Sequence, residues 1–170
     1  DSTGSNNTAI ALNGSIMPAW VMVHSPKNYT FDSTTGSLEG AMKLTKAGAG
    51  RLTLNGTNNY TGPTLIAEGS FVVNGSLPSS PITVRGGVWL DGRLGRIGVV
   101  GSPVSIYEGA GVSPGAGTNS PGRLTISSSL TLRGRTLNDF DLSDDPSGTT
   151  KTNDLLNIVG NLTLQGTNAL

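Results

Sequence analysis

Residues 44–75 read LTKAGAGRLTLNGTNNYTGPTLIAEGSFVVNG, and this stretch contains three short runs rich in β-branched and aliphatic side chains. The runs are Arg51 to Leu54, Thr64 to Ala67 and Phe71 to Val73. Side chains that alternate with a period of two are typical of β-strands. Asn-Gly pairs follow the first and third runs, where glycine supplies the positive φ that a tight corner requires. Strands this short, joined by sharp corners, predict a coiled β ribbon.

The same pattern extends outward from this stretch as successive coils of 18 to 22 residues. The coils are Met42 to Pro63, Thr64 to Pro81, Ile82 to Pro103 and Val104 to Arg123. In this alignment Leu65, Thr83, Ser105 and Thr125 stack on one another. A period near twenty residues indicates a solenoid rather than hairpins. The sequence therefore predicts an all-β parallel β-helix of about eight short rungs, with Val, Ile, Leu and Ala inward and Thr, Ser and Asn outward.

The composition agrees with this fold class. The 170 residues include 25 Gly and no Cys, with 13% charged and 35% apolar residues, which excludes a helical bundle. The absence of Cys excludes thiol catalysis, thiolate metal sites and disulfides. A formal charge of +0 and the lack of a basic cluster make nucleic acid an unlikely partner. No apolar run approaches the roughly 20 residues needed for a membrane-spanning helix.

We expect one β-helix segment over residues 1–170. Residues 1–41 are expected to form opening rungs, 42–134 the repeat-like core coils, and 135–170 closing strands with an acidic turn. The chain begins at Asp1, without a Met or a signal peptide, so we expect a processed product or a piece of a longer protein.

The stretch at 44–75 resembles the autotransporter-associated β-strand repeat. It follows that family's Leu-Thr-Lys-x-Gly opening, Leu-Thr-Leu strand, Asn-x-Tyr-Thr-Gly turn and closing Val-Asn-Gly. Residues 111–126, with their Ser-Pro-Gly segment, and residues 153–164 also look like parts of such repeats. The resemblance implies a right-handed parallel β-helix from a large secreted or surface-bound bacterial protein. In that family the repeat acts as a stalk or scaffold and sometimes assists passenger folding and secretion.

His24 is the only histidine, so any Ser/His/Asp triad or His-based metal site must use it. It lies between Val23 and Ser25-Pro26 without a nucleophile-elbow pattern, which favours a histidine on the surface or in a turn. A lyase-like β-helix enzyme would need clustered carboxylates and basic residues, and these are sparse. The sequence therefore predicts no catalytic residue, and a protein that is not an enzyme.

Four aspartates are concentrated near the C-terminal end: Asp139, Asp141, Asp144 and Asp145. Alternation puts the first two on one strand face, and the last two belong to an Asp-Asp-Pro-Ser-Gly turn. Hard carboxylate oxygens could gather around Ca²⁺, but the spacing matches no known calcium loop. We favour a solvated turn, keep calcium as the weaker alternative, and expect no other cofactor.

Aromatic rings on a flat β face commonly stack against sugars. The candidates are Trp20, Tyr29, Tyr60, Trp89 and Tyr107. Trp89 lies between Val88 and Leu90, so its side chain points outward if those of Val88 and Leu90 point inward. Trp89 could then form a sugar-binding platform with Tyr107 on the next coil. Trp20 is the other candidate for sugar stacking. The favoured alternative is that Trp89 packs under the loop from Arg93 to Gly98.

These observations predict a non-catalytic scaffold or adhesive segment of an exported bacterial protein, which spaces or presents other domains outside the cell or on its surface. The alternative is a carbohydrate-binding module attached to a polysaccharide-degrading enzyme. Expected partners are neighbouring domains of the same polypeptide, and also polysaccharide or cell-surface components. Exposed end rungs additionally favour self-association.

Overall fold

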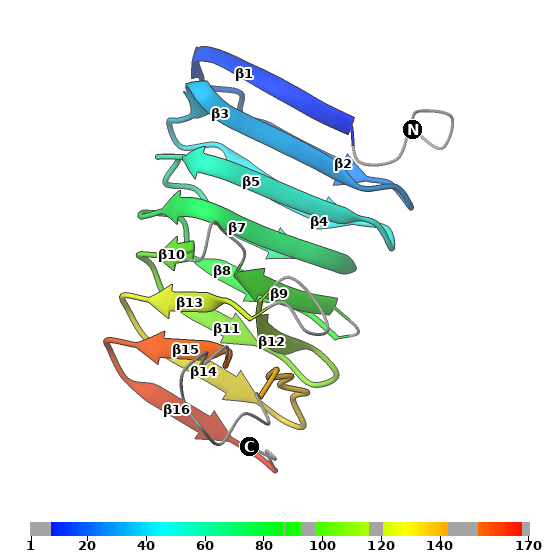
Figure 1. Ribbon diagram of the computed structural model, residues 1–170, viewed down its shortest axis with the longest axis vertical. Helices are drawn as coiled ribbons and strands as arrows, with labels where there is room; N and C mark the ends of the chain where they lie inside the picture. Colours follow the sequence, from blue (N-terminus) through cyan, green and yellow to red (C-terminus); the bar gives the residue numbers. More distant parts are fainter. Residues whose placement is uncertain (1–7, 87, 93–97, 116–120, 143–152, 168–170) are drawn as a thin grey trace.

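The computed structural model describes residues 8–86, 88–92, 98–115, 121–142 and 153–167. Over these residues the chain forms sixteen β-strands and no helix. Every pairing between these strands is parallel. The all-β class and the parallel solenoid predicted from the sequence are therefore confirmed (Figure 1).

Two sheets make up the solenoid. The larger sheet has the path β1 (Thr8–Ile16), β3 (Tyr29–Leu38), β5 (Arg51–Thr57), β7 (Gly69–Leu77), β10 (Gly98–Val100), β13 (Arg123–Ile126) and β15 (Leu155–Ile158). Beside this path, β9 (Val88–Gly92) pairs with both β7 and β12 (Gly111–Pro114). The smaller sheet consists of β2 (Trp20–His24), β4 (Lys43–Ala47), β6 (Thr64–Ile66), β8 (Ile82–Val84), β11 (Val104–Ile106), β14 (Leu130–Arg133) and β16 (Leu162–Gln165).

The coil is right-handed. In Figure 1 the chain runs along the near sheet, crosses to the far sheet and returns in the opposite direction while it descends from the N-terminus to the C-terminus. The smaller sheet takes one strand from each turn, and over the described residues it has seven strands. The predicted number of about eight rungs is therefore approximately right. The division at residues 41 and 134 stays a prediction.

The register confirms most of the predicted coils. Thr64 pairs with Ile82, and Ile82 with Val104, so coils do begin at these three residues. The predicted stack of Leu65, Thr83 and Ser105 is present, but its fourth member is wrong: Ser105 pairs with Thr131. Thr125 lies on the larger sheet beside Val99. The coil that starts at Val104 has more residues between β12 and β13 than the preceding coil has between β9 and β10, so the next smaller-sheet strand starts later in the sequence.

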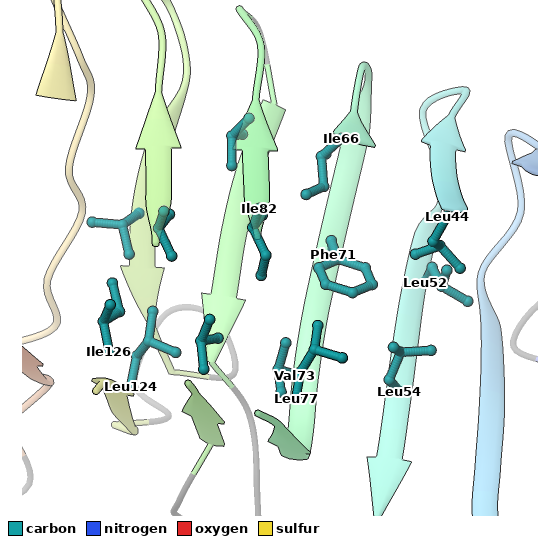
Figure 2. Packing of buried hydrophobic residues seen from close by; sticks show 14 of the residues in the cluster. Leu44, Leu52, Leu54, Ile66, Phe71, Val73, Leu77, Ile82, Leu124 and Ile126 are labelled. Carbon is teal, nitrogen blue, oxygen red and sulfur yellow. The ribbon is translucent and has the colours of Figure 1, made fainter. Parts of the chain in front are cut away.

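The core lies between the two sheets. Leu52 pairs with Phe71 and Leu54 with Val73 on the larger sheet, and all four side chains are fully buried. Figure 2 shows these side chains pointing into the space between the sheets, together with Ile66 and Ile82 from the smaller sheet. Inward ladders of this kind supply the hydrophobic stabilisation that a thin coil needs, because each rung buries its apolar side chains against the next.

Candidate functional site

The outer face of the smaller sheet carries a ladder with one outward residue from each strand. Pairing aligns Met22, Thr45, Leu65, Thr83, Ser105, Thr131 and Thr163. Five of these seven side chains bear hydroxyl groups, and each is at least partly exposed. The backbone of parallel strands repeats at about 4.8 Å, so the hydroxyl groups form a regular row along the solenoid.

Prolines border this face where three strands begin. Pro63, Pro81 and Pro103 precede β6, β8 and β11, and their carbonyl oxygens accept the N–H groups of Leu44, Thr64 and Ile82. A proline can occupy such a position because the start of a strand does not need its missing N–H. These rings therefore leave the hydroxyl row itself unobstructed within the sheet.

The other border of the same face carries a ring and two cations. Tyr107 follows β11 and is 42% exposed, and the guanidinium carbon of Arg133 lies 5.5 Å from the centre of its ring. Nη1 of Arg133 donates a hydrogen bond of 2.6 Å to Oε1 of Gln165 on the next strand. Arg85 is exposed at the corresponding position one strand earlier, since the N–H groups of Arg85 and Tyr107 bond to successive strands. This border can offer a planar apolar surface and positive charge to a ligand.

The three aromatic residues favoured from the sequence lie apart. Trp20 is 56% exposed on β2, near the N-terminal end of the smaller sheet, and its Nε1 donates to Oγ1 of Thr45 at 3.2 Å. The backbone of Trp89 lies on β9 of the larger sheet and pairs with Ser70 and Gly111, while its side chain is outside the described residues. Tyr107 directly follows β11 of the smaller sheet. Sugar stacking by Trp20, Trp89 or Tyr107 stays a prediction.

Tyr60 is a core residue rather than a surface ring. Its hydroxyl lies 2.6 Å from Oγ1 of Thr64, which lies 2.8 Å from Oγ of Ser80, and Ser80 donates to the carbonyl oxygen of Gly62 at 2.8 Å. Burial raises the pKa of Tyr60 to about 12, although the hydrogen bonds from its hydroxyl neighbours oppose this shift. Tyr29 is half-buried and packs against the core. Both rings therefore support the fold.

The acidic segment is organised by a residue that sequence reasoning missed. One carboxylate oxygen of Asp154 accepts the N–H of Gly122 and the other accepts the N–H of Asp141, both at 2.8 Å. Burial raises the pKa of Asp154, the two backbone hydrogen bonds oppose the shift, and the nearby charges of Asp141 and Asp139 add to it. No sequence signal announces this role, because its two partners are 32 and 13 residues away.

The predicted calcium ligands are only partly described. Asp139 is exposed and Asp141 is half-buried, whereas Asp144 and Asp145 lie outside the described residues. Within the described ranges, no three His, Asp or Glu side chains are arranged to hold a metal ion. Calcium binding by the four aspartates stays a prediction.

His24 occupies a surface position, as the sequence favoured. It is exposed at the end of β2 and pairs with Ala47 on β4. In the described part of the chain, its ring forms no hydrogen bond with a carboxylate. The arrangement around His24 is therefore not that of a catalytic triad over these residues.

Lys46 is a second residue that sequence reasoning missed. It is fully buried on β4, and its Nζ donates to the carbonyl oxygens of Ala47 at 2.9 Å, Gly48 at 2.5 Å and Glu68 at 3.2 Å. Burial lowers the pKa of Lys46 to about 8, and the charge of Glu68 opposes this shift. Because the ammonium group is enclosed by backbone carbonyls, Lys46 supports a corner of the coil and does not face a ligand.

A right-handed parallel solenoid of short coils, with an apolar interior and a hydroxyl-rich exterior, is the architecture of a passenger-type β-helix segment. Residues 44–73 match the model of the passenger-associated-transport-repeat family. The resemblance recognised in the sequence is therefore confirmed for this stretch, and residues 44–73 are a passenger-associated-transport repeat. In the described part of the chain, no helix is long and apolar enough to cross a membrane.

Two relatives extend this similarity. The chain is 32% identical over 148 residues to the adhesin BmaC autotransporter of Brucella suis biovar 1 (strain 1330), a match that covers 85% of this chain and 4% of the relative. It is 36% identical over 90 residues to an extracellular serine protease of Serratia marcescens, covering 52% of this chain and 8% of the relative. No solved structure matches the chain significantly. The chain thus spans a small fraction of these proteins, one named as an autotransporter adhesin and the other as an extracellular protease.

Proposed function

We propose that the chain is a non-catalytic structural segment of an exported bacterial protein, which spaces or presents neighbouring domains of the same polypeptide or contributes to surface adhesion. The observation that carries this proposal is a buried ladder that continues from strand to strand through Ile66, Val84, Ile106 and Leu132. A core that is continuous along the axis resists bending, because every rung packs against its neighbours.

Two further observations support a structural role. The outward ladder from Met22 to Thr163 on the smaller sheet is mostly hydroxyl-bearing and carries no charge, which suits a spacer in water. The relative named as a serine protease shares only 8% of its length with this chain, and the chain has a single histidine, which is exposed. The relative named as an adhesin favours the adhesive form of the proposal.

The spacer role is tested by measuring distances along the axis. The chain has no cysteine, so Met22→Cys and Thr163→Cys introduce a pair of spin-label sites six strand intervals apart on one outer ladder. We expect a narrow distance distribution near 30 Å, from about 4.8 Å per interval. This distribution should stay unchanged when the chain is fused between two folded domains. A broad distribution, or one that shifts on fusion, would contradict the spacer role.

The adhesive role needs a separate measurement. Beads coated with the chain are expected to attach to cultured epithelial cells or to abiotic surfaces more often than beads coated with a reporter protein of the same size. Equal attachment of both kinds of bead would remove adhesion from the proposal and leave the spacer role standing.

A further inference from the structure

We propose that the outer face of the smaller sheet binds an acidic polysaccharide through Arg85, Tyr107 and Arg133. The ligand class is a chain of sugar residues that carry carboxylate groups. This inference goes beyond the structural role above and does not depend on it.

Three successive coils each contribute two outward residues to this surface: Arg133 lies on β14, whereas Arg85 and Tyr107 directly follow β8 and β11, where their N–H groups still bond to the preceding strand. The pairs are Thr83 with Arg85, Ser105 with Tyr107, and Thr131 with Arg133, and the members of each pair are two residues apart. Such residues lie on the same face of a strand, roughly 6.6 Å from each other. The hydroxyl-bearing members are in direct register. The result is a row of hydroxyl groups that runs parallel to a row formed by cation, ring and cation.

Tyr107 supplies the stacking surface. Although the guanidinium of Arg133 lies over one face of the ring at 5.5 Å, the residue remains 42% exposed. The exposed ring lies beside the hydroxyl-bearing residues Thr83, Ser105 and Thr131 of the same face. The C–H face of a pyranose fits such a ring, and the ring hydroxyl groups of a sugar can pair with the row of Thr83, Ser105 and Thr131.

The two arginines supply the charge preference. Arg133 is held in place by the ring and by its 2.6 Å hydrogen bond to Gln165, so little conformational freedom is lost when it binds an anion. Arg85 is exposed, and two strand intervals place the two arginines about 10 Å apart. Guanidinium groups pair well with carboxylates because of their planar fork of donors.

The charged residues around the ring come from the neighbouring corners of the coil. Glu108 follows Tyr107 directly, and a Cβ atom added at Gly134 would lie 3.3 Å from its carboxylate, so this acid sits at the adjoining corner. Arg135 is exposed in the same corner. Glu68, two residues after Ile66, lies at the corner of the coil next to Arg85. Among these described residues no ion pair joins Glu108 to an arginine, and three arginines against two glutamates leave a surplus of positive charge. The surplus is local, because the whole chain has a formal charge of +0, which favours a carboxylated sugar chain over nucleic acid.

The experiment is affinity electrophoresis of the whole chain in gels that contain polygalacturonate, its fully methyl-esterified form, or neutral dextran. We expect retardation by polygalacturonate alone, and weaker retardation at higher salt. Arg85→Gln, Arg133→Gln and Tyr107→Ala are each expected to weaken the affinity about tenfold, as for loss of a charge-assisted or stacking contact. Thermal unfolding of each variant checks that the fold is retained.

Two control variants match these changes in kind. Lys43→Gln removes one exposed charge from the same sheet, and Trp20→Ala removes an exposed ring from its opposite end; both should leave the affinity unchanged. The proposal is overturned by equal retardation in the esterified polymer, by the absence of retardation in polygalacturonate, or by an equal loss of affinity in Lys43→Gln. It is also overturned if Trp20→Ala abolishes binding and Tyr107→Ala does not.

Discussion

The Nζ atom of Lys46 donates to the carbonyl oxygen of Glu68, which lies one coil further along the solenoid, at 3.2 Å. On the strand next to it, the position of Lys46 is taken by Ile66, a core residue. A lysine thus occupies an inward position of an apolar ladder and binds two turns of the coil together at a corner. An ammonium group tolerates such burial only when acceptors replace the lost water, and the three carbonyl oxygens do so.

Lys46→Met is therefore expected to destabilise the chain although methionine is apolar. The substitution leaves the carbonyl oxygens of Ala47, Gly48 and Glu68 without this donor, and such buried acceptors cost roughly 1–3 kcal/mol. Urea unfolding followed by circular dichroism measures the difference. Lys43→Met is the control, because Lys43 is exposed on the same strand. Equal midpoints for both variants would show that the carbonyl contacts of Lys46 contribute nothing.

Stability should also depend on pH through Lys46. Burial lowers its pKa in the folded chain to about 8, from an ordinary value of 10.5. Between these two values the unfolded chain keeps a proton that the folded chain has lost, so the free energy of unfolding rises with pH across this window. Below pH 8 both forms are protonated, and the cost of burying the charge is fully present.

Melting temperatures between pH 8 and pH 10 test this sign. The raised pKa of Tyr60, about 12, acts in the opposite direction above pH 10, because the unfolded chain then loses the tyrosine proton first. Both the wild-type chain and Lys46→Met contain Tyr60, so the contribution of Tyr60 cancels when their melting temperatures are subtracted. We expect the melting temperature of the wild type to rise relative to that of Lys46→Met as the pH increases from 8 to 10. If this difference in melting temperature stays constant or falls, the lowered pKa of Lys46 is contradicted.

Gly69 is required by close approach as well as by its backbone conformation. Its φ is 75°, and an added Cβ atom would lie 2.5 Å from the carbonyl oxygen of Gly50 and 2.8 Å from Nζ of Lys46. Gly14 provides a matched comparison, since its φ is 70° and nothing lies within 4 Å of the added atom. We expect Gly14→Ala to cost about 1 kcal/mol of strain and Gly69→Ala to cost at least about 1 kcal/mol more. Urea unfolding of the two variants measures both, and equal costs would exclude a steric role at Gly69.

The comparison of sequence with structure shows what local patterns can determine. Strand starts at Thr64, Ile82 and Val104 were predictable because each follows a proline and opens an alternating run. The position of Thr125 could not be predicted. Alternation indicates the face on which a residue lies within a strand, but it does not indicate how many residues form a corner. Because the coil that starts at Val104 is longer than predicted, Thr125 lies on the larger sheet.

In the candidate sites, too, local sequence patterns identify some residues but not the contacts that they make with distant parts of the chain. Tyr107 was a candidate because it is an aromatic residue on the coil after Trp89, but its contact with Arg133 depends on pairing across 26 residues. Lys46 looked like an ordinary polar residue of a strand, and only the enclosing carbonyls of the next coil reveal its burial. Asp154 likewise acts through backbone groups that are distant in the sequence. Long-range partners of this kind cannot be read from spacing alone.

The C-terminal end of the smaller sheet is expected to drive self-association. Leu162 and Leu164 continue the ladders of Leu130 and Leu132, which are buried, but they are 45% and 47% exposed because no described strand pairs with the other side of β16. Stacking a second copy on β16 would bury both side chains and pair its free backbone edge. Sedimentation velocity should show a dimer fraction that grows with concentration in the wild-type chain and falls in Leu164→Lys. Val159→Lys, which changes an exposed apolar residue outside these ladders, should behave like the wild type. A wild-type chain that stays monomeric at all concentrations, or the same loss of dimer in both variants, would exclude association through this end.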